Sequence, residues 1–227
     1  MVQEILSRLG IAMTITPLRL RLLVLLVATC TVIAASGCSR QPADNSAEAG
    51  FARDMATHHA QAVEMAFIVR DVTTDEALRA LSEDIIVTQS AQRGMFMAWL
   101  QQWDLPQASA GPRMAWMESH SSNAAPPMDH AGHTMATMPL MAGMASDAEL
   151  DTLRRATGLD AEVLFLQLMI RHHEGGVIMA KALLAQSSHE HVVTLARGID
   201  SGQLGEIATM KEMLSARSAK ALPSILR

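Results

Sequence analysis

The chain has 227 residues, of which 49% are hydrophobic and only 3% aromatic, and its formal net charge is −5. This length suits one domain with a substantial core and some additional segments. A mildly acidic sequence without basic clusters argues against nucleic acid as a partner. Methionine is abundant, at 17 residues, and both cysteines lie within residues 1–38, so the rest of the chain has neither a thiol nor a disulfide.

Residues 1–38 are typical of an export signal rather than of a fold. Three arginines precede an apolar run from Leu22 to Ala35, which is followed by Ser36-Gly37-Cys38. This pattern resembles a bacterial lipoprotein signal, in which Cys38 is lipidated and anchors the mature protein on the periplasmic or extracytoplasmic face of a membrane. An uncleaved anchor and ordinary secretion are the alternatives, because the run approaches the length of a short transmembrane helix. Either Met1 or Met13 is the start of the chain.

A first helical hairpin is expected over residues 47–103, after a polar tether at 39–46. Its first helix runs from Ala47 to about Asp71, and a capping box, Thr73-x-x-Glu76, opens a second helix that ends near Trp103. Residues 104–145 form a crossover in which five prolines, with several Gly and Ser, exclude a long regular element.

A short helix over residues 146–158, opened by Ser146-x-x-Glu149, precedes a second hairpin over 160–218. Asp160 is a candidate cap for a helix from Ala161 to about Gln186, and Ser187-x-x-Glu190 opens the last helix. Four long helices in two hairpins, joined by a long crossover, predict an all-α, ferritin-like four-helix bundle.

The two hairpins are copies of one unit. Phe51 to Arg70 (FARDMATHHAQAVEMAFIVR) recurs as Phe165 to Leu184 (FLQLMIRHHEGGVIMAKALL) at an offset of 114 residues. Each copy has a His–His pair with Met three residues before it and six residues after it. These residues are Met55, His58, His59 and Met65 in the first copy and Met169, His172, His173 and Met179 in the second. The chain therefore carries two copies of one site, or one site built from both.

At about 100° per residue, these His and Met side chains share one buried stripe of each helix, while Arg53, Gln61 and Glu64 occupy other faces. They would be ordinary core residues if each imidazole were hydrogen-bonded and each Met filled a gap. Burying four imidazoles is costly unless something satisfies them, so the pattern favours metal ligation. Imidazole with thioether suits copper, above all Cu(I), with Cu(II) a further candidate and silver a mimic.

Two other metal centres fit less well. A di-iron site in such a bundle needs Glu-x-x-His motifs, and the chain has none. Zinc held by His172, His173 and Glu174 remains an alternative, but it leaves the accompanying methionines unexplained.

The crossover is also rich in Met and His. Its candidate ligands are Met128, His130, His133, Met135, Met138, Met141 and Met144. Pro139 and Gly143 interrupt this run, so it is not a buried helix; a flexible binder of Cu(I) is favoured over a plain linker or an oxidant trap. Imidazole must be neutral to bind metal, whereas thioether does not titrate. We therefore expect copper held by the helical histidines to weaken between about pH 7 and 5, and copper held by the crossover to be less affected.

The segments FARDMATHHAQAVEMA and FLQLMIRHHEGGVIMAKALL, with the short helix SDAELDTLRRATG, resemble the CopM-like family (bacterial domain-of-unknown-function family 305), in its exported two-repeat type. The resemblance covers residues 47–217. It implies a ferritin-like bundle that binds copper or silver ions through the eight repeat residues and contributes to metal resistance. Ala60-Gln61 and Ile178 depart from the family pattern, in which Gln or Glu is usual, so the resemblance supports no carboxylate role.

The sequence thus predicts an exported copper-binding protein that acts in sequestration, resistance or hand-off. Its expected partners are metal ions, a membrane and other copper-handling proteins. A metalloenzyme such as a cuprous oxidase is an alternative, although no carboxylate or Tyr constellation supports it. A structural bundle whose methionine stripe docks another protein is the third hypothesis.

Overall fold

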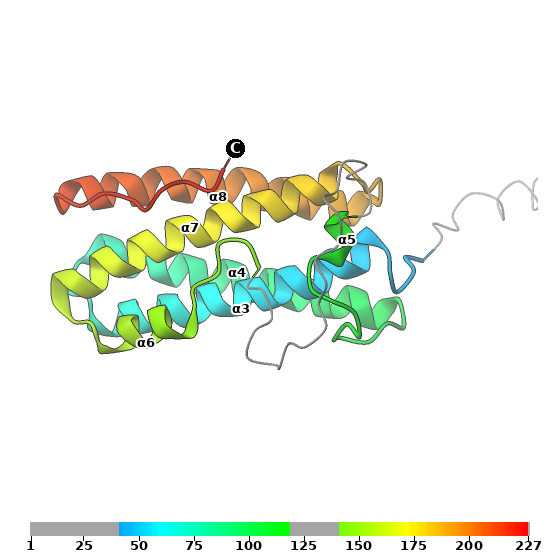
Figure 1. Cartoon of the computed structure of the whole chain (residues 1–227), viewed down its shortest axis with the longest axis horizontal. Coiled ribbons are helices and arrows are strands. Elements are labelled where there is room, and N and C mark those ends of the chain that lie inside the picture. The colour runs from blue at the N-terminus through cyan, green and yellow to red at the C-terminus, as the bar shows by residue number, and fades with distance from the viewer. Residues whose placement is uncertain (1–40, 119–140, 227) are drawn as a thin grey trace, which may run out of the picture. The chain divides into compact units, whose positions relative to one another are not determined.

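The computed structural model describes residues 41–118 and 141–226, and every regular element within them is an α-helix (Figure 1). Two hairpins, α3 with α4 and α7 with α8, pack together through α3 and α7. A short helix, α5, lies in the crossover, and α6 follows it. The helices are α3 (Ala47–Val72), α4 (Glu76–Gln102), α5 (Ala115–Glu118), α6 (Asp147–Arg155), α7 (Gly158–Leu184) and α8 (Glu190–Ala216). The predicted all-α bundle of two joined hairpins is confirmed.

The residues predicted to open the second helix of each hairpin do not cap it, and these two predictions are wrong. Asp75 caps α4, because its carboxylate accepts a hydrogen bond from the backbone N–H of Leu78 at 2.8 Å. In the second hairpin, α8 begins directly after His189. Thr73 and Ser187 therefore lie two residues before the N-cap residues Asp75 and His189, and their hydroxyls accept hydrogen bonds from the backbone N–H groups of those residues.

Thr73 and Ser187 instead join the two hairpins. The Thr73 hydroxyl donates to the Glu162 carboxylate at 2.6 Å, and the Ser187 hydroxyl donates to the Glu48 carboxylate at 2.5 Å. Glu162 lies 114 residues after Glu48, just as Ser187 lies 114 residues after Thr73, so these are two copies of one contact. The hairpins are thus related by an approximate two-fold axis, and each begins where the other one turns.

The helix starts after the crossover follow from local chemistry. Ser146 and Glu149 form the predicted capping box, with each side chain bonded to the other residue's backbone N–H. The sequence predicts that the next helix begins at Ala161, but α7 begins earlier, at Gly158. Glycine readily adopts the φ of 54° with which the chain leaves the turn. Asp160 therefore lies in the first turn of α7, where its charge favours the helix N-terminus without capping it.

The bundle interior consists of two apolar clusters, to which the antiparallel helices α3 and α7 both contribute. One cluster contains the N-terminal half of α3 and the C-terminal half of α7, including Phe51, Met55 and Met179. The other contains the remaining halves, including Met65 and Met169. On both helices the His–His pair lies between the residues of one cluster and those of the other.

Two polar residues that the helical wheel places on outer faces are in fact buried, because the crossover covers them. Arg53 is 5% exposed and donates from Nε to the carbonyl oxygen of Pro106 at 2.9 Å. Gln61 is 9% exposed and exchanges two hydrogen bonds, of 2.9 and 2.7 Å, with the backbone of Ala145. Glu64 keeps its predicted place at the surface. The prediction failed for Arg53 and Gln61 because helical periodicity does not reveal which loop returns over a helix.

After α8 the chain turns back, and its last residues run along the bundle (Figure 1). The Glu174 carboxylate, which is 1% exposed, accepts hydrogen bonds from the Ser224 hydroxyl at 2.7 Å and the Ile225 backbone N–H at 2.8 Å. The Gln167 amide donates to the carbonyl oxygen of Lys220 at 2.8 Å. Within the described parts of the chain, no helix has both the length and the apolar character needed to cross a membrane.

Candidate metal centre

The repeat brings its two His–His pairs together where α3 packs against α7. The rings of His58 and His172, which are equivalent in the two copies, lie with their centroids 3.7 Å apart and their planes tilted by 32°. His59 and His173 follow them on the same helices, and all four side chains have no solvent exposure. The prediction that each pair faces the bundle interior is confirmed, and the two copies form one continuous group.

Three of these histidines use the same ring nitrogen for a hydrogen bond. The Nε2 atoms of His58, His59 and His173 lie 3.2 Å from the carbonyl oxygen of Ala142, 2.7 Å from the Gln92 side-chain oxygen and 2.5 Å from the Glu206 carboxylate, respectively. Each of these partners is an oxygen that accepts, so each Nε2 carries the hydrogen. In a neutral ring the lone pair then lies on Nδ1.

The Nδ1 atoms are left without partners. Within the described residues, Nδ1 of all four histidines and also Nε2 of His172 are buried and make no hydrogen bond. A buried polar atom without a partner loses the free energy that water would supply, typically about 1–3 kcal/mol. Because a neutral imidazole has one nitrogen with a lone pair, the four rings offer four candidate electron-pair donors to a bound cation, one of them on either nitrogen of His172.

Burial also keeps three of the rings, those of His58, His59 and His172, neutral. Burial, reinforced by the neighbouring histidines, lowers the pKa of His58 to about 4, that of His59 to about 3, and that of His172 well below its ordinary value. Neutral imidazole is the form that binds metal. In the folded protein, protons therefore compete with a metal ion for His58 and His59 only below the pH range from 7 to 5, which is the range that the unperturbed pKa predicts.

Thioether sulfurs lie on both sides of the histidines. Met55 and Met179 belong to one apolar cluster, Met65 and Met169 belong to the other, and all four are fully buried. Because α3 and α7 are antiparallel, each cluster receives one Met from before a His pair and one from after the other pair. Imidazole nitrogen together with soft sulfur would suit Cu(I) and Ag(I) better than a hard cation.

Carboxylates contribute little to this group. Glu174, the third residue of the zinc alternative, is bonded to the C-terminal segment instead. In residues 41–118 and 141–226, no three side chains drawn from His, Cys, Asp and Glu converge in a way that would hold a metal ion. The four histidines are included in this absence, so within the described residues they do not by themselves form a three-ligand metal site.

The end of the crossover packs against the histidines. The Ala142 carbonyl oxygen is the partner of His58, and Gly143 and Gly175 let the two backbones meet, because a Cβ added at Gly175 would lie 1.9 Å from that oxygen. Met141 is 2% exposed and belongs to the same apolar cluster as Met55. Met144 packs at the edge of that cluster. The remaining crossover candidates lie outside the described residues, namely Met128, His130, His133, Met135 and Met138.

The helical wheel did not identify three groups that contact the histidines, namely Gln92, Glu206 and the Ala142 carbonyl. Gln92 and Glu206 obey the repeat offset of 114, and each lies 33 residues after its histidine. The repeat therefore contained a signal for the pair, although nothing in the sequence shows that they contact imidazole. A backbone carbonyl leaves no such signal.

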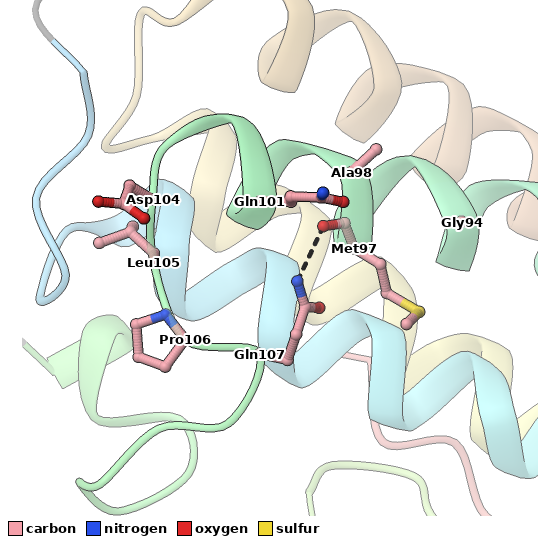
Figure 2. Close-up of a pocket in the computed structure, with 8 residues that line it drawn as sticks. All are labelled: Gly94, Met97, Ala98, Gln101, Asp104, Leu105, Pro106 and Gln107. Atoms are coloured by element: carbon pink, nitrogen blue, oxygen red, sulfur yellow. Dashed lines mark hydrogen bonds between the residues drawn. The ribbon is translucent and has the colours of Figure 1, made fainter.

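A surface pocket of 830 Å³ on α4 lies apart from this group (Figure 2). Figure 2 shows the Gln107 amide donating to the Met97 carbonyl oxygen, at 2.9 Å. The pocket has one thioether and no histidine, so it lacks the donors of a metal site. Its lining residues are Gly94, Met97, Ala98, Gln101, Asp104, Leu105, Pro106 and Gln107.

Comparison with known proteins identifies the family and the fold. The model of the family described as "Domain of unknown function (DUF305)" matches residues 48–214. A DUF305 protein from Streptomyces coelicolor is 44% identical and has a TM-score of 0.69, over 79% of this chain and 99% of its own. A DUF305 fragment from Deinococcus radiodurans is 32% identical and has a TM-score of 0.58, over 75% and 96%. CopM in its Cu(II)-bound form is 25% identical and has a TM-score of 0.54, over 75% and 97%. The search of curated proteins found no match.

Proposed function

Because the chain belongs to the DUF305 family, and because its repeat buries four imidazoles between two pairs of thioethers, we propose that the protein binds copper, chiefly Cu(I), with Ag(I) as a mimic. The observation that carries the proposal is the set of four buried imidazoles whose Nδ1 atoms have no hydrogen-bond partner in the described residues. Ligation would satisfy them and offset the cost of burying them. The copper- and silver-bound forms of CopM support this choice of ions.

The ion is cargo in this proposal, and each part of the chain has a role in holding it. Nδ1 of the four histidines supplies nitrogen donors, and Met55, Met65, Met169 and Met179 supply soft sulfur. The Met/His-rich crossover adds donors that can wrap an ion without a preformed cage, and its end at Met141 brings them to the bundle. The protein would thereby sequester copper, contribute to metal resistance, or pass the ion to another copper-handling protein.

Export is part of the proposal. The residues before the bundle resemble a lipoprotein signal, and the Streptomyces coelicolor relative is described as a candidate secreted protein. We propose a lipid anchor at Cys38 on the periplasmic or extracytoplasmic side. Cys38→Ala should then release the protein from the membrane fraction or leave it unprocessed, as fractionation followed by immunoblotting would show. Normal processing of this variant, with membrane retention, would contradict the anchor but leave copper binding intact.

The test of copper binding is Cu(I) stoichiometry by competition with a colorimetric chelator. Replacing His58, His59, His172 and His173 by Gln should remove at least one tightly held equivalent, because each donor nitrogen is lost while a polar side chain of similar size remains. His191→Gln is the matched control: His191 is exposed at the start of α8 and should be dispensable. Far-UV circular dichroism would confirm that both variants remain helical.

A second variant separates the crossover from the bundle. Replacing the Met and His residues of 119–140 by Ser should lower the total Cu(I) capacity and leave the bundle ions in place, because the described anchoring residues on either side of this segment are kept. Wild-type protein that binds no copper would refute the function. Equal loss from the His191→Gln control would refute the assignment of the ligands.

A further inference from the structure

The two copies of the repeat differ in the charge of one side chain that bonds to a histidine. The second histidine of each pair, His59 or His173, is bonded through Nε2 to a side chain 33 residues later. That side chain is the neutral amide of Gln92 in the first copy and the carboxylate of Glu206 in the second. The two hydrogen bonds are alike, with distances of 2.7 and 2.5 Å, and both rings are fully buried.

Both partners orient the ring in the same way. Each oxygen accepts a hydrogen from Nε2, which fixes the tautomer with its lone pair on Nδ1, and neither Nδ1 has a partner in the described residues. Gln92 and Glu206 are therefore positioning residues, which act on a bound ion through an imidazole. Such partners of ligating histidines typically change metal affinity by about 10- to 100-fold.

The difference between the partners is one of charge. Glu206 is the carboxylate that contacts a histidine of the group, and its side chain is 28% exposed whereas the ring is completely buried. The other nearby carboxylates are engaged elsewhere: Glu174 accepts from the C-terminal segment and Glu149 pairs with Arg171. A cation in a neutral, buried set of donors has no counter-charge, and a carboxylate behind one ligand supplies it. Hydrogen bonds to a charged acceptor are also about twice as strong as neutral ones.

We propose that Glu206 makes the two halves of the site unequal, so that a soft monovalent cation is bound first, and more tightly, on the His173 side, with Gln92 marking the weaker His59 side. This inference rests on the proposed function. It adds an order of filling, and it assigns that order to a single position in the repeat.

The test exchanges the two side chains, which are nearly isosteric. The variants are Glu206→Gln, Gln92→Glu and the double swap. Long-range ¹H–¹⁵N correlation spectra of the metal-free protein would first report which ring nitrogen of His59 and His173 carries the hydrogen. Ag(I) would then be added to one equivalent, and the affinity for the first ion measured by chelator competition.

In the wild type, both rings should carry hydrogen on Nε2, and the His173 Nδ1 signal should respond before that of His59. Glu206→Gln should weaken binding of the first ion at least tenfold and remove the order, Gln92→Glu should strengthen the His59 side, and the double swap should reverse the order. Retention of the wild-type order in the double swap, or unchanged affinity in Glu206→Gln, would overturn the inference while copper binding stood. Absence of any metal binding in the wild type would overturn the function and the inference together.

Discussion

The contact between the crossover and α7 can be tested by adding one methyl group at Gly175. In Gly175→Ala the new Cβ would lie 1.9 Å from the Ala142 carbonyl oxygen and 3.1 Å from the Gly143 Cα, and both are backbone atoms that cannot rotate away. The segment must therefore shift, which costs about 1–3 kcal/mol in overpacking and weakens hydrogen bonds to His58 and Gln61 worth roughly 0.5–1.5 kcal/mol each. Alanine returns up to about 1 kcal/mol of helix propensity.

We therefore expect Gly175→Ala to lower the free energy of unfolding by about 2–4 kcal/mol. Gly202→Ala is the matched control, because Gly202 is exposed on α8 with no atom within 4 Å of an added Cβ. It should raise stability by about 0.5–1 kcal/mol. Equilibrium urea denaturation of the metal-free proteins, followed by far-UV circular dichroism, measures both. If the two changes have the same sign, the close approach between the crossover and α7 is not as described.

Three further predictions concern the metal-free protein. Burial lowers the pKa of His58 to about 4 and that of His59 to about 3, so below pH 6.5 the unfolded state binds more protons than the folded state. The free energy of unfolding should therefore be highest above pH 6.5 and should fall by about 1–2 kcal/mol per histidine between pH 7 and 5. Urea titrations at both pH values would measure this fall. Gln203→Met removes a 4%-exposed amide whose side-chain atoms have no hydrogen-bond partner in the described residues. It should increase the free energy of unfolding by about 1 kcal/mol and so raise the melting temperature. A lower melting temperature would contradict this. Ending the chain at residue 218 removes both hydrogen-bond partners of the Glu174 carboxylate and should lower the free energy of unfolding, measured by urea titration, by about 1–3 kcal/mol. The same truncation should cost less in a Glu174→Gln background. An equal cost in both backgrounds would show that the lost stability does not come from Glu174.

The helices and the buried His/Met faces were predictable because both depend on periodicity, which the sequence carries directly. The same offset that relates Met55 to Met169 also predicted two copies of one hairpin. Helix starts were less predictable where two capping residues compete. Thr73 and Asp75 both suit a cap, and the choice depends on Glu162, which lies in the other hairpin and takes the Thr73 hydroxyl.

The surroundings of the histidines were the part that the sequence concealed. The contact between His173 and Glu206 joins two helices, so no local sequence pattern predicts it. The partner of His58 is the backbone carbonyl of Ala142, a group that every residue type has, so it leaves no mark in the sequence. The pKa values depend on complete burial, which follows from how the crossover and the neighbouring helices close over the rings. The acid range expected from an ordinary imidazole was therefore too high for His58 and His59.

The crossover is held at both of its ends by residues of α3. In its first part, the Asp54 carboxylate accepts hydrogen bonds from the Met114 backbone N–H and the Trp116 ring N–H. At its last residue, Gln61 exchanges two hydrogen bonds with the backbone of Ala145. The closure entropy of a flexible loop between two fixed anchors rises by about 0.6 kcal/mol for each doubling of its length. Insertions and deletions within residues 119–140 should consequently be nearly neutral for the fold. Under the proposed function, storage capacity can then change over evolutionary time by lengthening or shortening one segment, while the bundle and its buried histidines stay the same.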